Sequence, residues 1–186
     1  ILEIVTSLDG QRTVVEIAKE HDIAFEDLIY LLDYLKAKGI LDNVDSKEDF
    51  SEYDSFRRVI HFIAEYSHSH EHLLEMWENI QNSTVLIVGL GAVGTWVACN
   101  LVQSGVQNMI LMDGDVVDES NLHRQFGYSD TDIGRKKADA LGTRLKAYSD
   151  KVRVIKEYRF LDDQALHVFD DTKIDLIINC ADKPTV

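Results

Sequence analysis

The sequence contains few cysteines, no long apolar run, and far fewer basic than acidic residues. Its two cysteines, Cys99 and Cys180, lie within apolar helix and strand patterns, so we expect packing roles for them and no disulfide framework. No stretch approaches the roughly 20 apolar residues of a membrane-spanning helix, and the first residues lack the organisation of a signal peptide. We therefore expect a cytoplasmic protein with no membrane partner.

Positive charge is scarce, because the 186 residues include 19 Lys and Arg against 33 Asp and Glu, a formal net charge of −14. Such a chain repels phosphate backbones, so nucleic acid is not an expected partner. Hydrophobic residues make up 45% and charged residues 28%, which is typical of a globular protein that buries a core. The chain begins at Ile1 without a methionine and stops at Val186 just after a predicted strand, so we expect both ends to be cut.

Residues 1–44 have a helical apolar period with clear punctuation. Asp9-Gly10 ends a first short helix, and the segment from Thr13 to Glu16 is a capping-box pattern that begins a second one. A third helix is predicted over 25–38, before a short strand or wing that starts at 40–41. The apolar positions of the three helices are Ile1, Ile4, Val5 and Leu8; Val14, Ile17 and Ala18; and Leu28, Ile29, Leu32 and Leu35.

Three short helices followed by a strand are the outline of a winged helix-turn-helix, which usually binds DNA through its last helix. Residues 1–50 nevertheless contain twelve acidic side chains against five basic ones, a net charge of −7. Three of the acids, Glu26, Asp27 and Asp33, lie on the third predicted helix, where a DNA duplex would repel them. We therefore do not expect DNA binding.

The same segment resembles the PqqD-like peptide-recognition element of ribosomal-peptide biosynthesis. That family binds a leader peptide as an added strand against its sheet and third helix. The resemblance implies that residues 1–44 bind a precursor or leader peptide, and a small helical domain that only packs on its neighbour is the alternative. The matching residues are Leu8-Asp9-Gly10, the run from Arg12 to Ala18, Leu31, Leu35 and Gly39-Ile40-Leu41.

Residues 45–55 are acidic and lack an apolar period, which predicts a linker. Helical patterns resume over 56–66 and 70–81. Four histidines near these helices invite a metal site, but only two have the i, i+4 spacing of one helix face, and no cysteine or clear carboxylate partner shares that face. We interpret the four as solvated or packed side chains. They are His61, His68, His70 and His72, of which His68 and His72 have that spacing.

A glycine-rich turn follows the apolar run 84–88 and precedes a predicted helix. In Gly89-Leu-Gly91-Ala-Val-Gly94 the glycines let the backbone turn tightly and approach a phosphate, while the helix N-terminus directs its N–H groups at the anion. A second apolar run ends at Asp113, 19 residues after Gly94, where a dinucleotide-binding unit carries its ribose-binding acid. By itself this pattern predicts an NAD site.

The block after Asp113 favours a different nucleotide. It clusters Asn, Arg and Lys side chains beside the expected ribose-binding acid, and a redox cofactor needs no such cluster. A triphosphate does, because Arg clamps phosphate oxygens with its planar fork and Lys supplies charge as pyrophosphate leaves. The expected ligand is therefore ATP. The residues of the block are Asp115, Asn121, Arg124, Gln125 and Lys137.

The segment from Val85 to Lys137 resembles the ThiF/MoeB/HesA adenylyltransferases, which are relatives of the ubiquitin-activating enzymes. The shared motifs are the glycine turn, Asp-x-Asp, Asn-Leu-x-Arg-Gln and Gly-x-x-Lys, and residues 174–182 resemble the strand that delivers the family's magnesium-binding aspartate. Extended back to Phe56, the resemblance implies a Rossmann-like, doubly wound and mainly parallel α/β fold over 56–186. A small winged-helix-like domain would precede it.

Carried over by position, the family's functional residues imply a site for ATP and Mg²⁺. Asp113 would hold the ribose, Asp182 would bind Mg²⁺, and Gln125 would support the cluster around the phosphates. The glycines Gly89, Gly91 and Gly94 would form the floor of the triphosphate site, and the side chains around the phosphates would be Asp115, Asn121, Arg124 and Lys137.

The resemblance also implies a homodimer, because in the family an arginine ahead of the glycine turn reaches the partner's ATP. Arg57 matches the second arginine of that Arg-x-x-Arg segment, whereas the first position is Asp54 and the nearest substitute is Arg58. A zinc site belongs to the family's later half, which this chain does not include.

The implied reaction is adenylation of a carboxylate, usually a polypeptide C-terminus. The carboxylate attacks the α-phosphate in line and pyrophosphate leaves, while the protein contributes positioning and charge stabilisation. The layout resembles peptide-modifying adenylating enzymes of the microcin C type, so residues 1–44 would select a precursor peptide and residues 56–186 would activate its carboxyl end. The alternatives are a sulfur-carrier-protein adenylyltransferase of the thiamine or molybdopterin type, a non-catalytic leader-peptide-binding scaffold, and an NAD-binding oxidoreductase.

Overall fold

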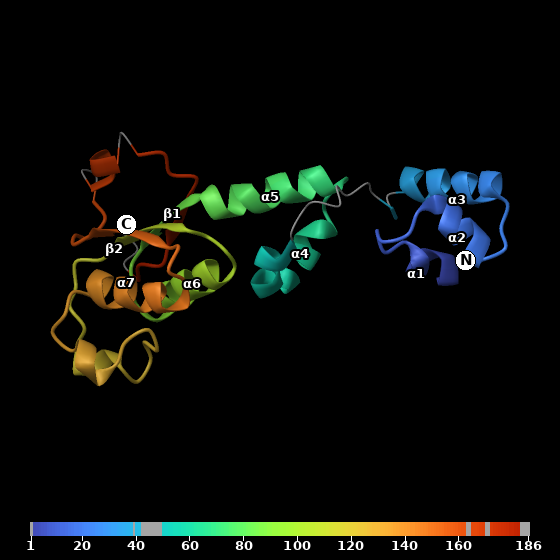
Figure 1. Cartoon of the computed structure of the whole chain (residues 1–186). Helices are drawn as coiled ribbons and strands as arrows, with labels where there is room; N and C mark the ends of the chain where they lie inside the picture. The colour runs from blue at the N-terminus through green and yellow to red at the C-terminus, as the bar shows by residue number, and fades with distance from the viewer. Residues whose placement is uncertain (1, 39, 42–49, 163–164, 170–171, 183–186) are drawn as a thin grey trace. The chain divides into compact units, whose positions relative to one another are not determined.

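The structure divides into two compact units, Ile1–Met76 and Trp77–Val186, with the division inside one helix (Figure 1). The boundaries predicted from the sequence, with a first domain to residue 44 and a second from 56, stay a prediction. The computed structural model describes residues 2–38, 40–41, 50–162, 165–169 and 172–182.

The first unit is helical throughout its described residues. Its N-terminal helices form where the apolar period predicts them, and a 3₁₀ helix occupies part of the predicted linker. None of the helices in the described part of the chain is long and apolar enough to cross a membrane. The elements are α1 (Leu2–Ser7), α2 (Val14–Glu20), α3 (Phe25–Ala37), η1 (Phe50–Phe56), α4 (Arg57–Ala64) and α5 (His70–Asn82), whose last residues belong to the second unit.

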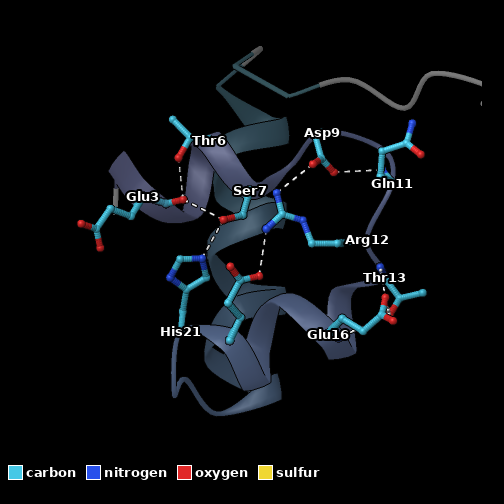
Figure 2. A network of polar contacts seen from close by, with 10 residues as sticks. Glu3, Thr6, Ser7, Asp9, Gln11, Arg12, Thr13, Glu16 and His21 are labelled. Carbon is cyan, nitrogen blue, oxygen red and sulfur yellow. Dashed lines mark hydrogen bonds and ion pairs between the residues drawn. The ribbon is translucent and has the colours of Figure 1, made fainter.

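Polar contacts hold the turn between α1 and α2 (Figure 2). The predicted capping box is present, because the Thr13 N–H donates to Glu16 Oε2 at 2.8 Å and the Glu16 N–H donates to Thr13 Oγ1 at 3.3 Å. The Arg12 guanidinium donates to Asp9 Oδ2 at 2.7 Å and to Glu20 Oε2 at 2.9 Å. The Arg12 hydrogen bond lowers the pKa of the Asp9 carboxyl, and the Thr13 backbone N–H lowers the pKa of the Glu16 carboxyl.

Ser7 joins α1 to the end of α2. Its buried hydroxyl donates to the Glu3 carbonyl oxygen at 2.9 Å and lies 2.7 Å from His21 Nε2 (Figure 2). The serine has one hydroxyl proton, so it can donate to only one of these two groups at a time, and the role of His21 Nε2 depends on its tautomer.

A small apolar core joins the three N-terminal helices. Leu28 and Leu35 of α3 are buried as predicted, but Ile29 is 36% exposed, so the prediction was wrong for that residue. One residue step turns a helix by about 100°, which carries Ile29 away from the core once Leu28 faces it. Residues 40–41 form no strand, and the rest of the predicted wing lies outside the described residues. The buried members of this core are Ile4, Ile17, Ala18 and Leu28.

The second unit is built on a parallel sheet of four strands. Its elements are β1 (Thr84–Val88), α6 (Ala92–Gln103), β2 (Asn108–Met112), η2 (Glu119–Asn121), η3 (Asp130–Asp132), α7 (Lys137–Tyr148), β3 (Arg153–Glu157), η4 (Ala165–Phe169) and β4 (Leu176–Asn179). The strand order is β3-β2-β1-β4, so the chain moves outward from β1 through β2 to β3 and then returns to the other side of β1. This reversal is typical of Rossmann-like folds and confirms the predicted α/β class.

Alternate residues of the strands face two apolar layers. Val85 and Ile87 of β1 pack in the layer formed with α6 and α7, whereas Leu86 and Val88 pack with Phe169 of η4 on the opposite face (Figure 1). Residues 85–88 of β1 are all apolar, because a parallel strand in the middle of such a sheet is buried on both sides.

The strand β4 differs from the expected buried strand, because it forms an edge of the sheet among the described residues. It pairs with β1 from Val85↔Leu176 to Val88↔Asn179, and Leu176 and Ile177 remain 49% and 50% exposed. Cys180, which follows β4, is half-buried rather than enclosed. This strand is therefore less buried than β1 and β2.

Candidate functional site

A cavity of about 800 Å³ opens at the carboxyl ends of the strands in the second unit. Ligands of open α/β sheets bind in this position, outside the strand ends and near the point where the strand order reverses. The cavity collects residues from the turn after β1, from the segment after β2, and from the ends of β3 and β4. The sequence-predicted residues that line it are Gly89, Gly91, Asp113, Asp115, Asn121, Arg124, Gln125, Lys137 and Asp182.

The three glycines of the turn after β1 are required for different reasons. Gly89 has φ +82°, and a Cβ there would lie 2.7 Å from the backbone nitrogen of Ala181, so this turn touches the segment after β4. A Cβ on Gly94 would collide with the carbonyl oxygen of Gly89, so Gly94 supports the turn from inside α6 and does not line the cavity.

Gly91 is the glycine that faces open space. A Cβ built on it meets only Gln125 Nε2, at 3.8 Å, which is ordinary van der Waals contact, and its φ of −78° suits any residue. Neither the packing nor the backbone explains a glycine there. Gly91 is the N-cap of α6, whose first N–H groups have no partner within the helix, so a missing side chain leaves room for an anion to approach them.

Asp113 is buried at the end of β2, and backbone groups already engage its carboxylate. Its Oδ2 accepts a hydrogen bond from the Leu90 N–H at 2.7 Å, and its Oδ1 accepts one from the Asp115 N–H at 2.8 Å. The carboxylate thus joins the end of β2 to the glycine turn. Each carboxylate oxygen still has a second lone pair for a ligand hydroxyl, as the predicted ribose contact requires.

Lys137, the first residue of α7, is buried beside two of the predicted acids. Its Nζ lies 3.0 Å from Asp115 Oδ2 and 4.0 Å from Asp113 Oδ2. The neighbouring Lys136 donates from Nζ to the Gly114 carbonyl oxygen at 2.9 Å. The two lysines therefore hold both ends of the Asp-Gly-Asp turn, and the Lys137 charge reaches the cavity only beside carboxylates that can orient it.

Asn121 and Arg124 come from the loop between β2 and α7. Asn121 Oδ1 accepts from the Asp118 N–H at 3.3 Å, within the capping box of η2. Arg124 is exposed and donates from Nη1 to the Ser120 carbonyl oxygen at 2.7 Å, which leaves the rest of its guanidinium toward the cavity that it lines. This arrangement suits the predicted clamp on phosphate oxygens.

Gln125 carries the strongest sign of a missing ligand. The residue is only 5% exposed, and its Oε1 has no hydrogen-bond partner among the described residues. A buried acceptor without a partner costs free energy, and native proteins rarely leave one unsatisfied. Because Gln125 lines the cavity, a ligand that donates an N–H or O–H there would satisfy it.

Carboxylates are the metal-ligating groups at this cavity. Asp182 is exposed on its wall, and oxygen donors of this kind suit Mg²⁺, which commonly takes one or two carboxylates plus substrate phosphates. Within the described ranges, no group of three or more His, Cys, Asp or Glu side chains is arranged to hold a metal ion. The donor set therefore fits a metal that arrives with a phosphate ligand.

His68 and His72 stack on each other, with ring centroids 5.2 Å apart.

Arg57 does not belong to the described cavity. It is exposed at the start of α4, in the first compact unit, as is Arg58 next to it. Cys180 lines the cavity, and Cys99 of α6 lies in the core. Burial raises the pKa of both thiols, which suits the predicted packing roles.

Sequence reasoning missed two groups of residues at the site. Phe160 and Leu161 line the cavity after β3, and the rule that parallel strands end at one edge of the sheet would have pointed to them. Phe126, Gly127 and Tyr128 directly follow Gln125 and attach its loop to the glycine turn and α6. No local signal distinguishes these three residues, because their partners lie some 30 to 40 positions away in sequence, as in the bond from the Tyr128 hydroxyl to the Leu90 carbonyl.

The fold and the cavity agree with comparisons to known proteins. Residues 67–186 match the model of the ThiF family, and the chain belongs to that family. Tested against this match, the resemblance inferred from the glycine turn and the Asn-Leu-x-Arg-Gln motif is confirmed at the level of the family.

Among its relatives is the tRNA threonylcarbamoyladenosine dehydratase of Bacillus subtilis (strain 168), which is 32% identical over 105 residues, 56% of this chain and 41% of that protein. Another is the molybdopterin-synthase adenylyltransferase of Escherichia coli (strain K12), 34% identical over 109 residues, 59% of this chain and 43% of that protein. The chain thus spans less than half the length of these curated relatives.

Solved structures share the fold over nearly the whole chain. The crystal structure of PaaA, in its selenomethionine form, superposes with a TM-score of 0.78 at 27% identity, covering 95% of this chain and 55% of PaaA. Escherichia coli MccB in complex with ATP superposes with a TM-score of 0.68 at 22% identity, covering 93% of this chain and 49% of MccB. At that identity the likeness to MccB concerns the fold.

Proposed function

We propose that this chain is part of an ATP-dependent adenylyltransferase that activates the C-terminal carboxylate of a peptide or small protein. The observation that carries the proposal is the convergence, in one cavity, of a glycine turn at a helix N-terminus with an arginine, a lysine and four carboxylates. Such a set has the groups that a nucleoside triphosphate needs and exceeds what a dinucleotide needs. The ATP-bound structure of the neighbour MccB and the adenylyltransferase names of relatives support it.

The residue roles follow from position and chemistry. Asp113 holds the ribose hydroxyls, the Gly91 region takes the phosphates, and Gln125 accepts a ligand hydrogen bond through its free Oε1. Arg124 and Lys137 hold phosphate oxygens and offset the charge that develops on pyrophosphate. Asn121 adds a polar contact at the same wall, and Asp115 orients Lys137.

The reaction needs no covalent nucleophile from the protein. A substrate carboxylate oxygen forms a bond to the α-phosphorus of ATP, the bond from that phosphorus to the bridging oxygen breaks, and pyrophosphate leaves with the electron pair. The products are an acyl-adenylate and pyrophosphate. Mg²⁺, when bound by Asp182 and the phosphates, supplies charge neutralisation. This chain's own groups contribute orientation and electrostatic stabilisation of the leaving group.

The N-terminal helices are proposed to select the substrate peptide. Tyr30 and Tyr34 of α3 are 77% and 52% exposed, and Lys38 Nζ lies 5.7 Å from the centre of the Tyr34 ring. Exposed aromatic side chains on this helix offer an apolar surface to a bound peptide. A precursor or leader peptide of ribosomal-peptide biosynthesis is the partner we propose. The neighbour MccB, solved with MccA, supports a peptide partner.

A sulfur-carrier protein is the second candidate substrate, because the relative from Escherichia coli is named a molybdopterin-synthase adenylyltransferase. Both substrates present a C-terminal carboxylate, so the proposed chemistry is the same. We also propose that the enzyme acts in the cytoplasm as a homodimer, with Arg57 reaching the partner's nucleotide. We propose that the whole enzyme also binds zinc, through the later half that the family shares.

ATP–pyrophosphate exchange tests the proposal. Radioactive pyrophosphate should enter ATP in the presence of the carboxylate substrate and Mg²⁺, because adenylate formation is reversible. The assay uses the chain and, in parallel, a longer version that reaches the length of its relatives. Exchange with leader peptides but not with carrier proteins selects the first substrate. Binding of a leader peptide without any exchange would instead indicate a non-catalytic scaffold, and stabilisation by NAD but not ATP would indicate an oxidoreductase.

A further inference from the structure

Leu90, in the centre of the glycine turn, has both of its backbone polar groups held by buried side chains. Its N–H donates to Asp113 Oδ2 at 2.7 Å, and its carbonyl oxygen accepts a hydrogen bond from the Tyr128 hydroxyl at 2.7 Å. Leu90 is fully buried and Tyr128 is 5% exposed, so water does not compete for either bond. The bond from Tyr128 fixes the peptide between Leu90 and Gly91, which also carries the Gly91 N–H at the start of α6.

Tyr128 belongs to the same loop as the residues proposed to bind phosphates. This loop begins after Val117 and closes at Gly134 and Arg135. There the Gly134 N–H donates to the Val117 carbonyl and the Val117 N–H donates to the Arg135 carbonyl, both at 2.8 Å. Arg124 and Gln125 lie inside the excursion. The Tyr128 hydroxyl therefore connects the loop that carries these side chains to the turn whose backbone faces them.

Gly127, the residue before Tyr128, also attaches the loop to the glycine turn and α6. A Cβ on Gly127 would lie 2.6 Å from the Thr95 Cβ, so the loop packs directly on the first turns of α6. Thr95 in turn donates from Oγ1 to the Gly91 carbonyl oxygen at 2.9 Å. Two neighbouring residues thus attach the loop to the centre of the glycine turn and to the helix that follows it.

The phenol has the properties of a permanent donor. Burial raises the pKa of Tyr128, so the hydroxyl keeps its proton throughout the range in which the protein is folded. Phenylalanine would fill the same apolar space in the core without donating. A tyrosine that only filled the core would therefore be replaceable by phenylalanine with no effect on ligand binding.

We propose that Tyr128 is a positioning residue for the phosphates of the nucleotide. Its hydroxyl fixes the Leu90 peptide so that Gly91 and the first turn of α6 present their N–H groups to the anion, and it holds the loop of Arg124 in register with them. This inference rests on the proposed function, because it assigns the turn to a phosphorylated ligand. It adds a residue that makes no contact with the ligand itself.

Calorimetric titration of the whole chain with ATP and with adenosine tests it. In Tyr128→Phe we expect the dissociation constant for ATP to rise about tenfold, the effect of one lost buried hydrogen bond, and that for adenosine to stay unchanged. Tyr158→Phe is the matched control, because it removes a hydroxyl that donates to Asp139 at 3.0 Å on the exposed side of β3. The control should bind both ligands like the wild type.

The outcomes separate this inference from the proposed function. If the wild type binds no ATP, the result contradicts both the proposed function and this inference. If the wild type binds ATP and Tyr128→Phe binds ATP equally well, Tyr128 does not position the phosphates. The same conclusion follows if Tyr128→Phe loses affinity for ATP and for adenosine in equal proportion. Either result contradicts this inference and leaves the proposed function unaffected. Should Tyr128→Phe fail to fold, Gly127→Ala displaces the same attachment with the phenol intact. It should weaken ATP binding and spare adenosine, and unchanged ATP binding by a folded Gly127→Ala would overturn the inference.

Discussion

Asp113 and Leu90, 23 residues apart in sequence, are joined by a 2.7 Å hydrogen bond between the buried carboxylate Oδ2 and the backbone N–H. The bond ties the end of β2 to the turn after β1, so the acid expected to bind ribose also shapes the phosphate-binding turn. A single carboxylate thereby couples the two halves of the cavity. Variants at this residue should change both stability and ligand binding.

Replacement of Asp113 by Asn tests this dual role. The amide retains one acceptor oxygen, so one of the two backbone N–H groups loses its partner inside the protein, and we expect the free energy of unfolding to fall by about 1–3 kcal/mol. Denaturant unfolding measures the change, and ATP titration should show weaker binding. Asp150→Asn, at an exposed turn residue, is the control. An Asp113→Asn variant as stable as the wild type would contradict the coupling.

The glycines at 91 and 94 should respond oppositely to alanine. Gly94→Ala places a methyl group against the Gly89 carbonyl oxygen, so we expect a large loss of stability, on the order of 3 kcal/mol, through overpacking. Gly91→Ala meets ordinary contact distances and should melt near the wild-type temperature while ATP affinity falls, because the methyl group occupies the approach of the phosphates. Equal ATP affinity of Gly91→Ala and the wild type would remove Gly91 from the site.

Arg124→Ala should abolish most pyrophosphate exchange without destabilising the fold. The side chain is exposed, and its contacts with the Ser120 carbonyl oxygen and with His123 lie within its own loop, so its removal leaves no buried group unpaired. We expect exchange to fall by about 10²-fold or more, as for other electrostatic groups at a transition state. Arg153→Ala is the matched control, since Arg153 lies at the other end of the sheet. Exchange at wild-type rates in Arg124→Ala would exclude the proposed clamp.

Acid should destabilise the first unit through Glu16. The Thr13 backbone N–H, and then the Thr13 hydroxyl, lower the pKa of the Glu16 carboxyl below its ordinary value of 4.5. A lowered folded-state pKa contributes stability above the ordinary value, and this contribution disappears as the pH falls through the folded value. The gap in melting temperature between the wild type and Glu16→Gln should therefore shrink from about pH 7 to about pH 3. A gap that does not depend on pH would show that the charge of Glu16 is irrelevant.

The sequence predicts the local parts of this structure well. β1 forms over 84–88 as its apolar run indicates, and the capping box from Thr13 to Glu16 is present. The predicted side chains after β2 do line one cavity, namely Asp113, Asp115, Asn121, Arg124, Gln125 and Lys137. Each of these rests on a short-range pattern or on a fold rule for strand ends. The exposure of Ile29 was missed, because the exact width of a buried helix face depends on tertiary neighbours.

The contacts that hold the site together could not be predicted from the sequence, because they also depend on tertiary neighbours. The hydroxyl of Tyr128 reaches Leu90 across 38 residues, and Phe160 closes against Gly114 from a different strand. Neither residue type signals such a contact, since tyrosine and phenylalanine are ordinary core residues. Conversely, the sequence did indicate Gln125, and the structure sharpens that prediction by showing its Oε1 buried and unpaired.

A crystal structure with a non-hydrolysable ATP analogue and Mg²⁺ tests the central claim most directly. The account predicts the ribose hydroxyls at Asp113, a phosphate oxygen within hydrogen-bond distance of the Gly91 N–H, and Arg124 and Lys137 on the triphosphate with Mg²⁺ at Asp182. It also predicts that Gln125 Oε1 gains a donor. Density for the nucleotide elsewhere on the molecule, or in the cavity with its phosphates turned away from the glycine turn, would contradict the account.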